Sequence, residues 1–184
     1  MIGGLSVEDV RAVNHTYVYT GYEEISPYLH VLCDEIVHYA SVVRVLEGLG
    51  YEQYADEIKL KLKYWVSELV IKLATQKYVN GLASELSSTV KPLWSLRISD
   101  EELRFYLYKL LNFGISVRDG KASSEAAKDL LLDFIDIFEV DLIKVPTVMK
   151  VLEDLDPELV LQTLLVGLIA STKGLSGGHN IVEN

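Results

Sequence analysis

Residues 52–78 read EQYADEIKLKLKYWVSELVIKLATQKY. The run contains neither proline nor glycine, whereas Gly50 precedes it and Gly81 follows it. Apolar side chains recur within it at spacings of three and four residues, which is the period of an α-helix. The stretch therefore predicts one long helix that reaches about residue 78 and stops at Asn80-Gly81.

The apolar side chains of this predicted helix form two stripes on roughly opposite sides. The first consists of Ile58, Leu62, Trp65, Leu69 and Leu73, and the second of Leu60, Tyr64 and Ile71. A helix that is apolar on two sides is either enclosed by its own bundle or shared with a partner. Lysines lie between the stripes, and lysine is almost never buried unpaired, which argues against full enclosure. We therefore expect the tryptophan stripe to face the core and the stripe of Leu60, Tyr64 and Ile71 to form an interface.

A second long helix is predicted just before this one. Ser26-Pro27 supplies a serine cap and a proline in the first turn, and Gly48 and Gly50 end the helix. Between them, apolar residues at spacings of three and four define one buried face: Leu29, Leu32, Ile36, Ala40 and Val43. Because the connection is short, the helices near 27–47 and 52–78 should pack as a long antiparallel hairpin near 27–78.

Further start and stop signals predict shorter helices along the rest of the chain. They lie near 6–14, 82–90, 99–114, 124–140, 146–155 and 157–173. The most apolar stretch, 159–171, is shorter than the roughly 20 residues that cross a bilayer, so we expect a buried helix and no membrane partner. One segment, TYVYT at 16–20, favours an extended conformation. The predicted fold is an all-α bundle of about seven helices in a single domain, 1–174, with a flexible tail at 175–184.

Composition narrows the class of protein. Apolar residues make up 49% and charged residues 24% of the 184, as in an ordinary globular protein. A single cysteine, Cys33, rules out an internal disulfide framework and is too few for a zinc ribbon. Together with the lack of a targeting signal in residues 1–6, it favours a reducing compartment, and we expect the cytoplasm. The scarcity of glutamine hints at a thermophilic source.

One cluster has the residue types of a metal site. His30, Asp34 and His38 recur every four residues and lie on one face of the first long helix. A metal could join Asp34 to either histidine but not to both, because the histidines are roughly 12 Å apart along the axis. No second Glu-x-x-His pair accompanies Glu35 and His38, so a di-iron bundle is disfavoured. We expect these side chains to bond to one another on a partly wet face, and we expect no cofactor.

The charge distribution raises a different possibility. The net charge is −10, yet residues 59–97 carry seven basic and two acidic side chains. A phosphate backbone could lie along the lysines of this segment, of which Lys59, Lys63, Lys72 and Lys77 are the candidates. The lack of clustered arginine and the acidic remainder of the chain disfavour nucleic acid.

The sequence contains no constellation that meets the geometric requirements of catalysis. We therefore favour a non-enzymatic helical adaptor or assembly subunit that acts through protein contacts, as a homo-oligomer or as part of a larger assembly. A nucleic-acid-associated subunit that uses residues 59–97 is the first alternative. A metal-dependent helical enzyme centred on Asp34 and His38 is the second.

Overall fold

The computed structural model describes residues 26–75, 77 and 79–173. In this part of the chain 77% of residues are helical, with seven α-helices and no strand, which confirms the predicted all-α bundle. The α-helices are α2 Ser26–Gly48, α3 Glu52–Leu73, α4 Leu82–Ser87, α5 Asp100–Arg118, α6 Ser124–Ile137, α7 Pro146–Asp154 and α8 Pro157–Ala170. Two short 3-10 helices, η2 Leu93–Ser95 and η3 Leu142–Lys144, connect them. The helix predicted near 6–14, the extended segment at 16–20 and the tail at 175–184 lie outside the described residues.

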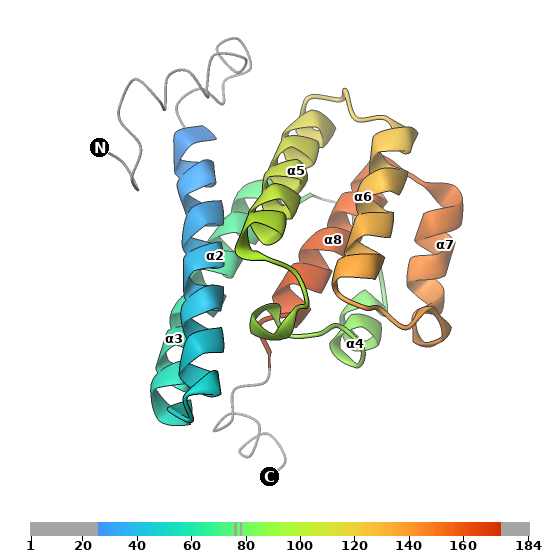
Figure 1. The fold of residues 1–184 in the computed structure, drawn as a ribbon. Coiled ribbons are helices and arrows are strands. Elements are labelled where there is room, and N and C mark those ends of the chain that lie inside the picture. Colours follow the sequence, from blue (N-terminus) through green and yellow to red (C-terminus); the bar gives the residue numbers. More distant parts are fainter. Residues whose placement is uncertain (1–25, 76, 78, 174–184) are drawn as a thin grey trace.

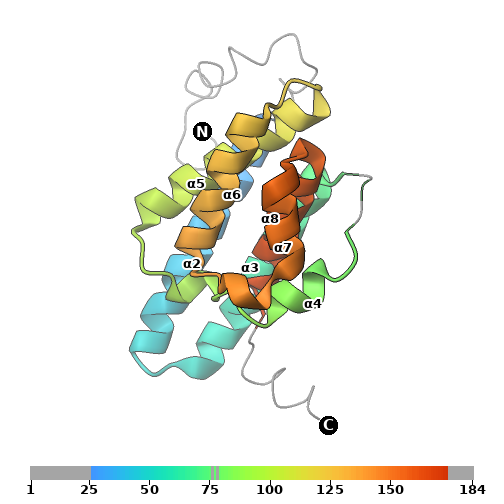
Figure 2. The same cartoon turned by 90° about the vertical axis from the view of Figure 1, so that its right-hand side faces the viewer.

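Helix α8 is the centre of the bundle. It contacts α3, α4, α5, α6 and α7, and Figures 1 and 2 show these helices arranged around it. Its side chains are mostly apolar, and those of Val160, Leu161, Leu164, Leu165 and Leu168 are almost completely buried. Each such side chain contributes roughly 1.5–3 kcal/mol when it leaves water, so α8 is stable only where neighbours cover it all round.

The two longest helices, α2 and α3, form the predicted antiparallel hairpin at one side of the molecule (Figure 1). The chain reverses at Gly50, whose φ of +82° lies in the left-handed region that glycine adopts without strain. The amide of Tyr51 then donates to the carbonyl of Leu46 at 2.9 Å, which closes the turn. The inner side of this hairpin packs on α5 and α8.

Caps that were recognisable in the sequence begin the later helices. The hydroxyl of Ser99 accepts from the amide of Glu102, whose carboxylate accepts from the amide of Ser99 at 3.1 Å, so a capping box begins α5. Asp156 caps α8 by accepting from the amide of Glu158 at 3.0 Å. The cap of α6 is Ser123 rather than Ser124.

Several predicted helix ends were wrong. We expected α5 to end at Gly114, but the helix continues to Arg118. This glycine permits close packing, because a β-carbon there would lie 2.9 Å from Cδ2 of Leu73 on α3. Helix α3 ends at Leu73 rather than near residue 78, since the backbone of Ala74 is extended, with ψ of 142°. Helix α8 ends at Ala170, a few residues before the predicted end.

None of the helices within the described residues combines the length and the apolar character that a membrane span requires.

The contact between α6 and α8 provides a test of the packing. Gly167 of α8 lies against the ring of Phe134, and an added β-carbon would overlap with the ring. Phe134 is completely buried, so the ring has no room to move away. We expect Gly167→Ala to lower the free energy of unfolding by about 1–3 kcal/mol, as measured by urea titration.

Gly48→Ala is the control, because Gly48 has no neighbour within 4 Å of an added β-carbon. Its stability should match the wild type or slightly exceed it. Equal stability of the two variants would show that α6 and α8 are less closely packed than described.

Candidate interaction surface

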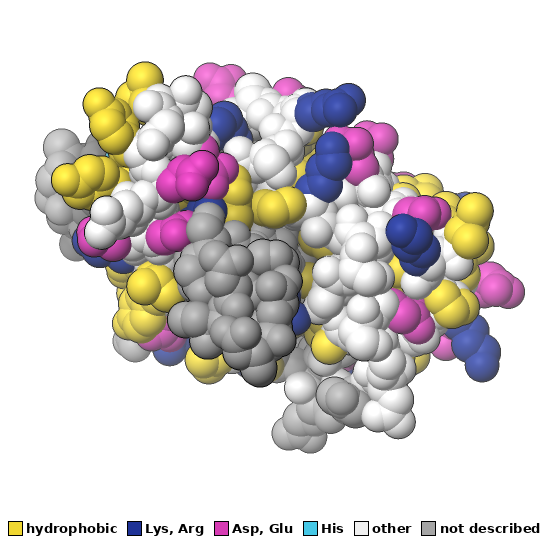
Figure 3. Space-filling model, turned by 90° about the horizontal axis from the view of Figure 1, so that it is seen from below, with side chains coloured by type: hydrophobic (Ala, Val, Ile, Leu, Met, Phe, Trp, Pro, Cys, Tyr) yellow, Lys and Arg dark blue, Asp and Glu magenta, His cyan; other side chains and the backbone are white. Residues whose placement is uncertain are grey.

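Exposed apolar side chains are concentrated on the α2–α3 hairpin. Of the twelve large hydrophobic side chains exposed in the described part of the chain, eight belong to it: Tyr28, Val45, Leu49, Tyr51, Tyr54, Leu60, Tyr64 and Ile71. Viewed from below, hydrophobic side chains gather on the left of the molecule, where Figure 1 places the hairpin (Figure 3). Large apolar patches on a protein surface are common at sites of interaction, so the hairpin is the candidate surface.

Helix α3 has one side in the core and the other in water. Leu62, Leu69 and Leu73 of the tryptophan stripe are buried, while Ile58 and Trp65 are partly buried at its edge. On the opposite side the side chains of Leu60, Tyr64 and Ile71 are 57%, 56% and 66% exposed. We call these three residues the outer stripe. The core of the chain therefore covers one stripe of α3 and leaves the other without a cover among the described residues.

Neighbouring polar groups hold the aromatic side chains of this surface. The hydroxyl of Tyr64 donates to the carboxylate of Glu68, and this interaction is the main cause that raises the pKa of Tyr64 above its ordinary value. The ring of Tyr64 also meets that of Trp65 edge to face, with 5.4 Å between centroids. Nζ of Lys72 lies 5.8 Å from the centre of the Tyr28 ring. These contacts restrict the orientation of the aromatic side chains on this surface.

The four candidate lysines for nucleic acid do not form one exposed row. Lys59 is 2% exposed, although we expected the lysines to resist burial. Its Nζ lies 2.6 Å from Glu47 and 3.3 Å from Asp56, and 4.7 Å from the centre of the Trp94 ring. These two carboxylates and the ring supply the partners that a buried ammonium needs, and they leave it no access to a phosphate.

The other three candidate lysines are distributed along the helix and beyond it. Lys77 pairs with Asp156 at 2.7 Å, and Lys72 is partly buried beside Tyr28. Lys63 is exposed.

In the candidate metal cluster, Asp34 forms an ion pair with Arg104. Asp34 accepts a hydrogen bond from the hydroxyl of Tyr108 at 2.6 Å and from Nε of Arg104 at 3.2 Å. His30 is buried with its ring 4.9 Å from the Tyr108 ring, whereas His38 is exposed beside Tyr39. In the described part of the chain no three His, Cys, Asp or Glu side chains come together as metal ligands would.

Sequence reasoning missed Arg104 and Tyr108, because nothing in one sequence shows which face of a later helix meets Asp34. The pKa of Tyr108 is raised, mainly by burial and then by the hydrogen bond to Asp34. The tyrosine therefore remains a protonated donor at neutral pH. The arrangement ties α2 to α5 and leaves Asp34 surrounded by donors rather than by metal ligands.

Cys33 lies on the inner face of α2 and is completely buried. Burial is the main cause that raises the pKa of its thiol far above the ordinary value, with a smaller contribution from the charge of Asp34. A thiol becomes a nucleophile only as the thiolate and only where a reagent can reach it. Cys33 therefore has the environment of a packing residue.

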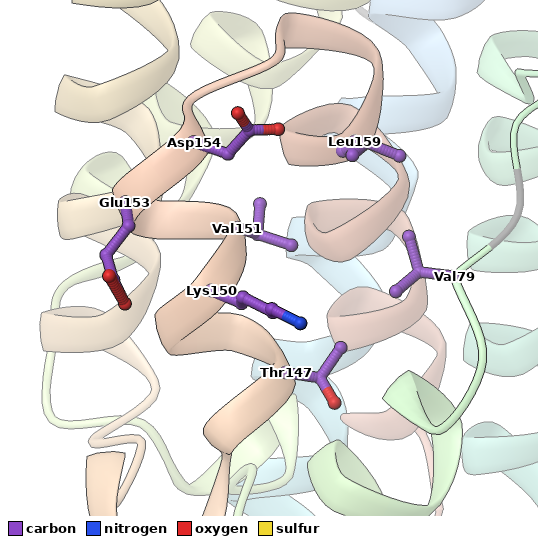
Figure 4. A pocket seen from close by; sticks show the side chains of 7 residues that line it. All are labelled: Val79, Thr147, Lys150, Val151, Glu153, Asp154 and Leu159. Atoms are coloured by element: carbon purple, nitrogen blue, oxygen red, sulfur yellow. The ribbon is translucent and has the colours of Figure 1, made fainter.

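A hollow of about 470 Å³ lies between α7, α8 and the segment around residue 79. Figure 4 shows the side chains that line this hollow, among them Val79, Thr147 and Lys150. Thr147 is already engaged, since its hydroxyl and its amide both donate to the carboxylate of Glu85. The single hydroxyl among these lining residues is therefore held by a carboxylate from α4.

No model of a protein family, no curated protein and no solved structure matches this chain.

The environment of Cys33 can be tested with a thiol reagent. Because the thiol is buried and its pKa is raised, it stays protonated at neutral pH. The native protein should react with Ellman's reagent at least about 100-fold more slowly than the denatured protein, since reaction must wait for local opening. Immediate stoichiometric reaction of the native protein would contradict the buried position.

The buried ion pair predicts a difference between two lysines on one helix. Lys59→Met keeps most of the side-chain volume but leaves Glu47 and Asp56 without their shared cation. Both carboxylates retain contact with water, so we expect a loss of about 1–2 kcal/mol in the free energy of unfolding. Lys63→Met is the matched control, because Lys63 is exposed on the same helix. Equal stability of the two variants would mean that the pair contributes nothing.

Proposed function

We propose that this chain is a non-enzymatic assembly subunit or adaptor that binds another protein through the outer stripe of α3. One observation carries the proposal: a core helix presents Leu60, Tyr64 and Ile71 to water on the side opposite its buried face. Exposed apolar residues scattered singly are normal, but three on one helix face beside further exposed tyrosines form a continuous surface.

The residue types of this surface fit a protein partner. Interface cores are enriched in aromatic side chains, and tyrosine supplies a large contact area with few rotatable bonds. The outer stripe is bordered by both signs of charge, with Lys61 and Lys63 alongside Glu57 and Glu68, so it lacks the single positive sign that a nucleic acid backbone requires. The proposal includes a cytoplasmic location, which the single buried thiol of Cys33 supports.

The test compares the native particle with a variant of the outer stripe. In an extract of its native cells the wild type should elute on a sizing column as a particle larger than the 20.7 kDa of one chain. Tyr64→Glu together with Ile71→Glu places two carboxylates where apolar contact is needed. This double variant should remain helical by circular dichroism and elute as a smaller species.

Leu132→Glu together with Ile143→Glu is the control, since both residues are exposed and apolar but lie on α6 and η3, away from the hairpin. This pair should leave the particle size unchanged. A wild type that elutes as a single chain, or an outer-stripe variant with the wild-type size, would overturn the proposed function.

A further inference from the structure

The outer stripe has the spacing of a coiled-coil seam. Leu60, Tyr64, Ser67 and Ile71 follow one another at intervals of four, three and four residues. This is the alternation of the a and d positions in a heptad, which place side chains along one seam between two helices. The buried face of α3 serves the core of the chain. The seam therefore provides a second packing surface on the same helix.

From this seam we infer that the partner is a second copy of the chain, with the two α3 helices antiparallel about a two-fold axis between Tyr64 and Ser67. The inference rests on the proposed function and names its partner. In this register Leu60 of one copy meets Ile71 of the other, and Tyr64 meets Ser67. In the two central layers a large side chain thus faces a small one, and a tyrosine opposite a serine fills space that two tyrosines could not share.

Charges beside the seam favour the same register. Lys61 and Glu68 are seven residues apart and lie on one flank of the outer stripe. A two-fold axis brings the same flank of each helix together, so Lys61 of each copy faces Glu68 of the other. Within the described chain Lys61 is exposed and pairs with no carboxylate, and Glu68 accepts from Tyr64 with room for a second donor.

Exposed tyrosines at both ends of the seam extend the proposed contact between the two copies. Tyr54, which is 61% exposed, lies seven residues before Lys61 and so shares its flank. Tyr28 lies against Lys72 at the other end of the hairpin and is 41% exposed. Antiparallel pairing brings Tyr54 of each copy toward Tyr28 of the other. Two exposed tyrosines at each end add apolar area that the seam alone, about 16 Å long, does not provide.

Cross-linking distinguishes the two orientations. In the antiparallel register Leu60 of one copy meets Ile71 of the other, whereas the two copies of Leu60 are about 16 Å apart along the axis, beyond the reach of a disulfide. We therefore expect a mixture of Leu60→Cys and Ile71→Cys chains to form a covalent dimer on mild oxidation. Either variant alone should form little, and the buried native Cys33 contributes no background.

Charge reversal tests the register in the unmodified seam. Lys61→Glu should raise the dissociation constant of the purified dimer about ten-fold, because two attractions become two repulsions. Adding Glu68→Lys to the same chain should restore the wild-type value, since each pair is then reversed as a whole. Analytical ultracentrifugation gives these constants, and circular dichroism checks that each variant stays helical.

The outcomes separate this inference from the proposed function. A dimer that cross-links through Leu60→Cys alone, or one that the second charge reversal fails to restore, overturns the antiparallel register while the proposed function stands. A purified chain that stays monomeric, beside a larger particle in the native extract, replaces the second copy with a different protein. A single chain in both preparations overturns both.

Discussion

The burial of α8 determines how the other helices are placed. Most of the fourteen residues from Pro157 to Ala170 are apolar and eight of them are buried, so water must be excluded from most of the surface of this helix. The buried hydroxyl of Thr163 has a hydrogen-bond partner within the helix, since it donates to the carbonyl of Leu159 at 2.8 Å. Five helices cover α8, and α3 is one of them. Because α8 is covered by the inner side of α3, the opposite side of α3 is left facing outward.

Local and periodic features of the fold could be predicted from the sequence. The period of the apolar residues predicted the α2–α3 hairpin, and the Ser99 and Asp156 caps fixed where α5 and α8 begin. Helix ends were harder to predict, because a glycine in the sequence can either end a helix or allow two helices to pack closely. At Gly114 the deciding neighbour is Leu73, which lies on another helix and cannot be identified from the glycine's own surroundings in the sequence.

Pairings between distant residues limited the prediction of the site. The exposed stripe of Leu60, Tyr64 and Ile71 could be predicted from the helical period together with the lysines between the stripes, since lysine is almost never buried unpaired. The burial of Lys59 could not be predicted in this way, because it depends on Trp94 and Glu47, which lie outside α3. The same holds for Asp34, whose neighbours Arg104 and Tyr108 lie seventy or more residues further along the chain.

The polar and apolar side chains of the hairpin have different roles. Asp34 holds α2 against α5 through Arg104 and Tyr108, and Lys59 joins the turn end of the hairpin to η2 through the Trp94 ring. These polar groups are bonded to partners on other elements, so they resist sliding of the hairpin over the core. A hairpin held in this way presents its outer stripe in one geometry. Since ordering a surface on binding costs free energy, a rigid apolar stripe binds a partner with less loss than a mobile one.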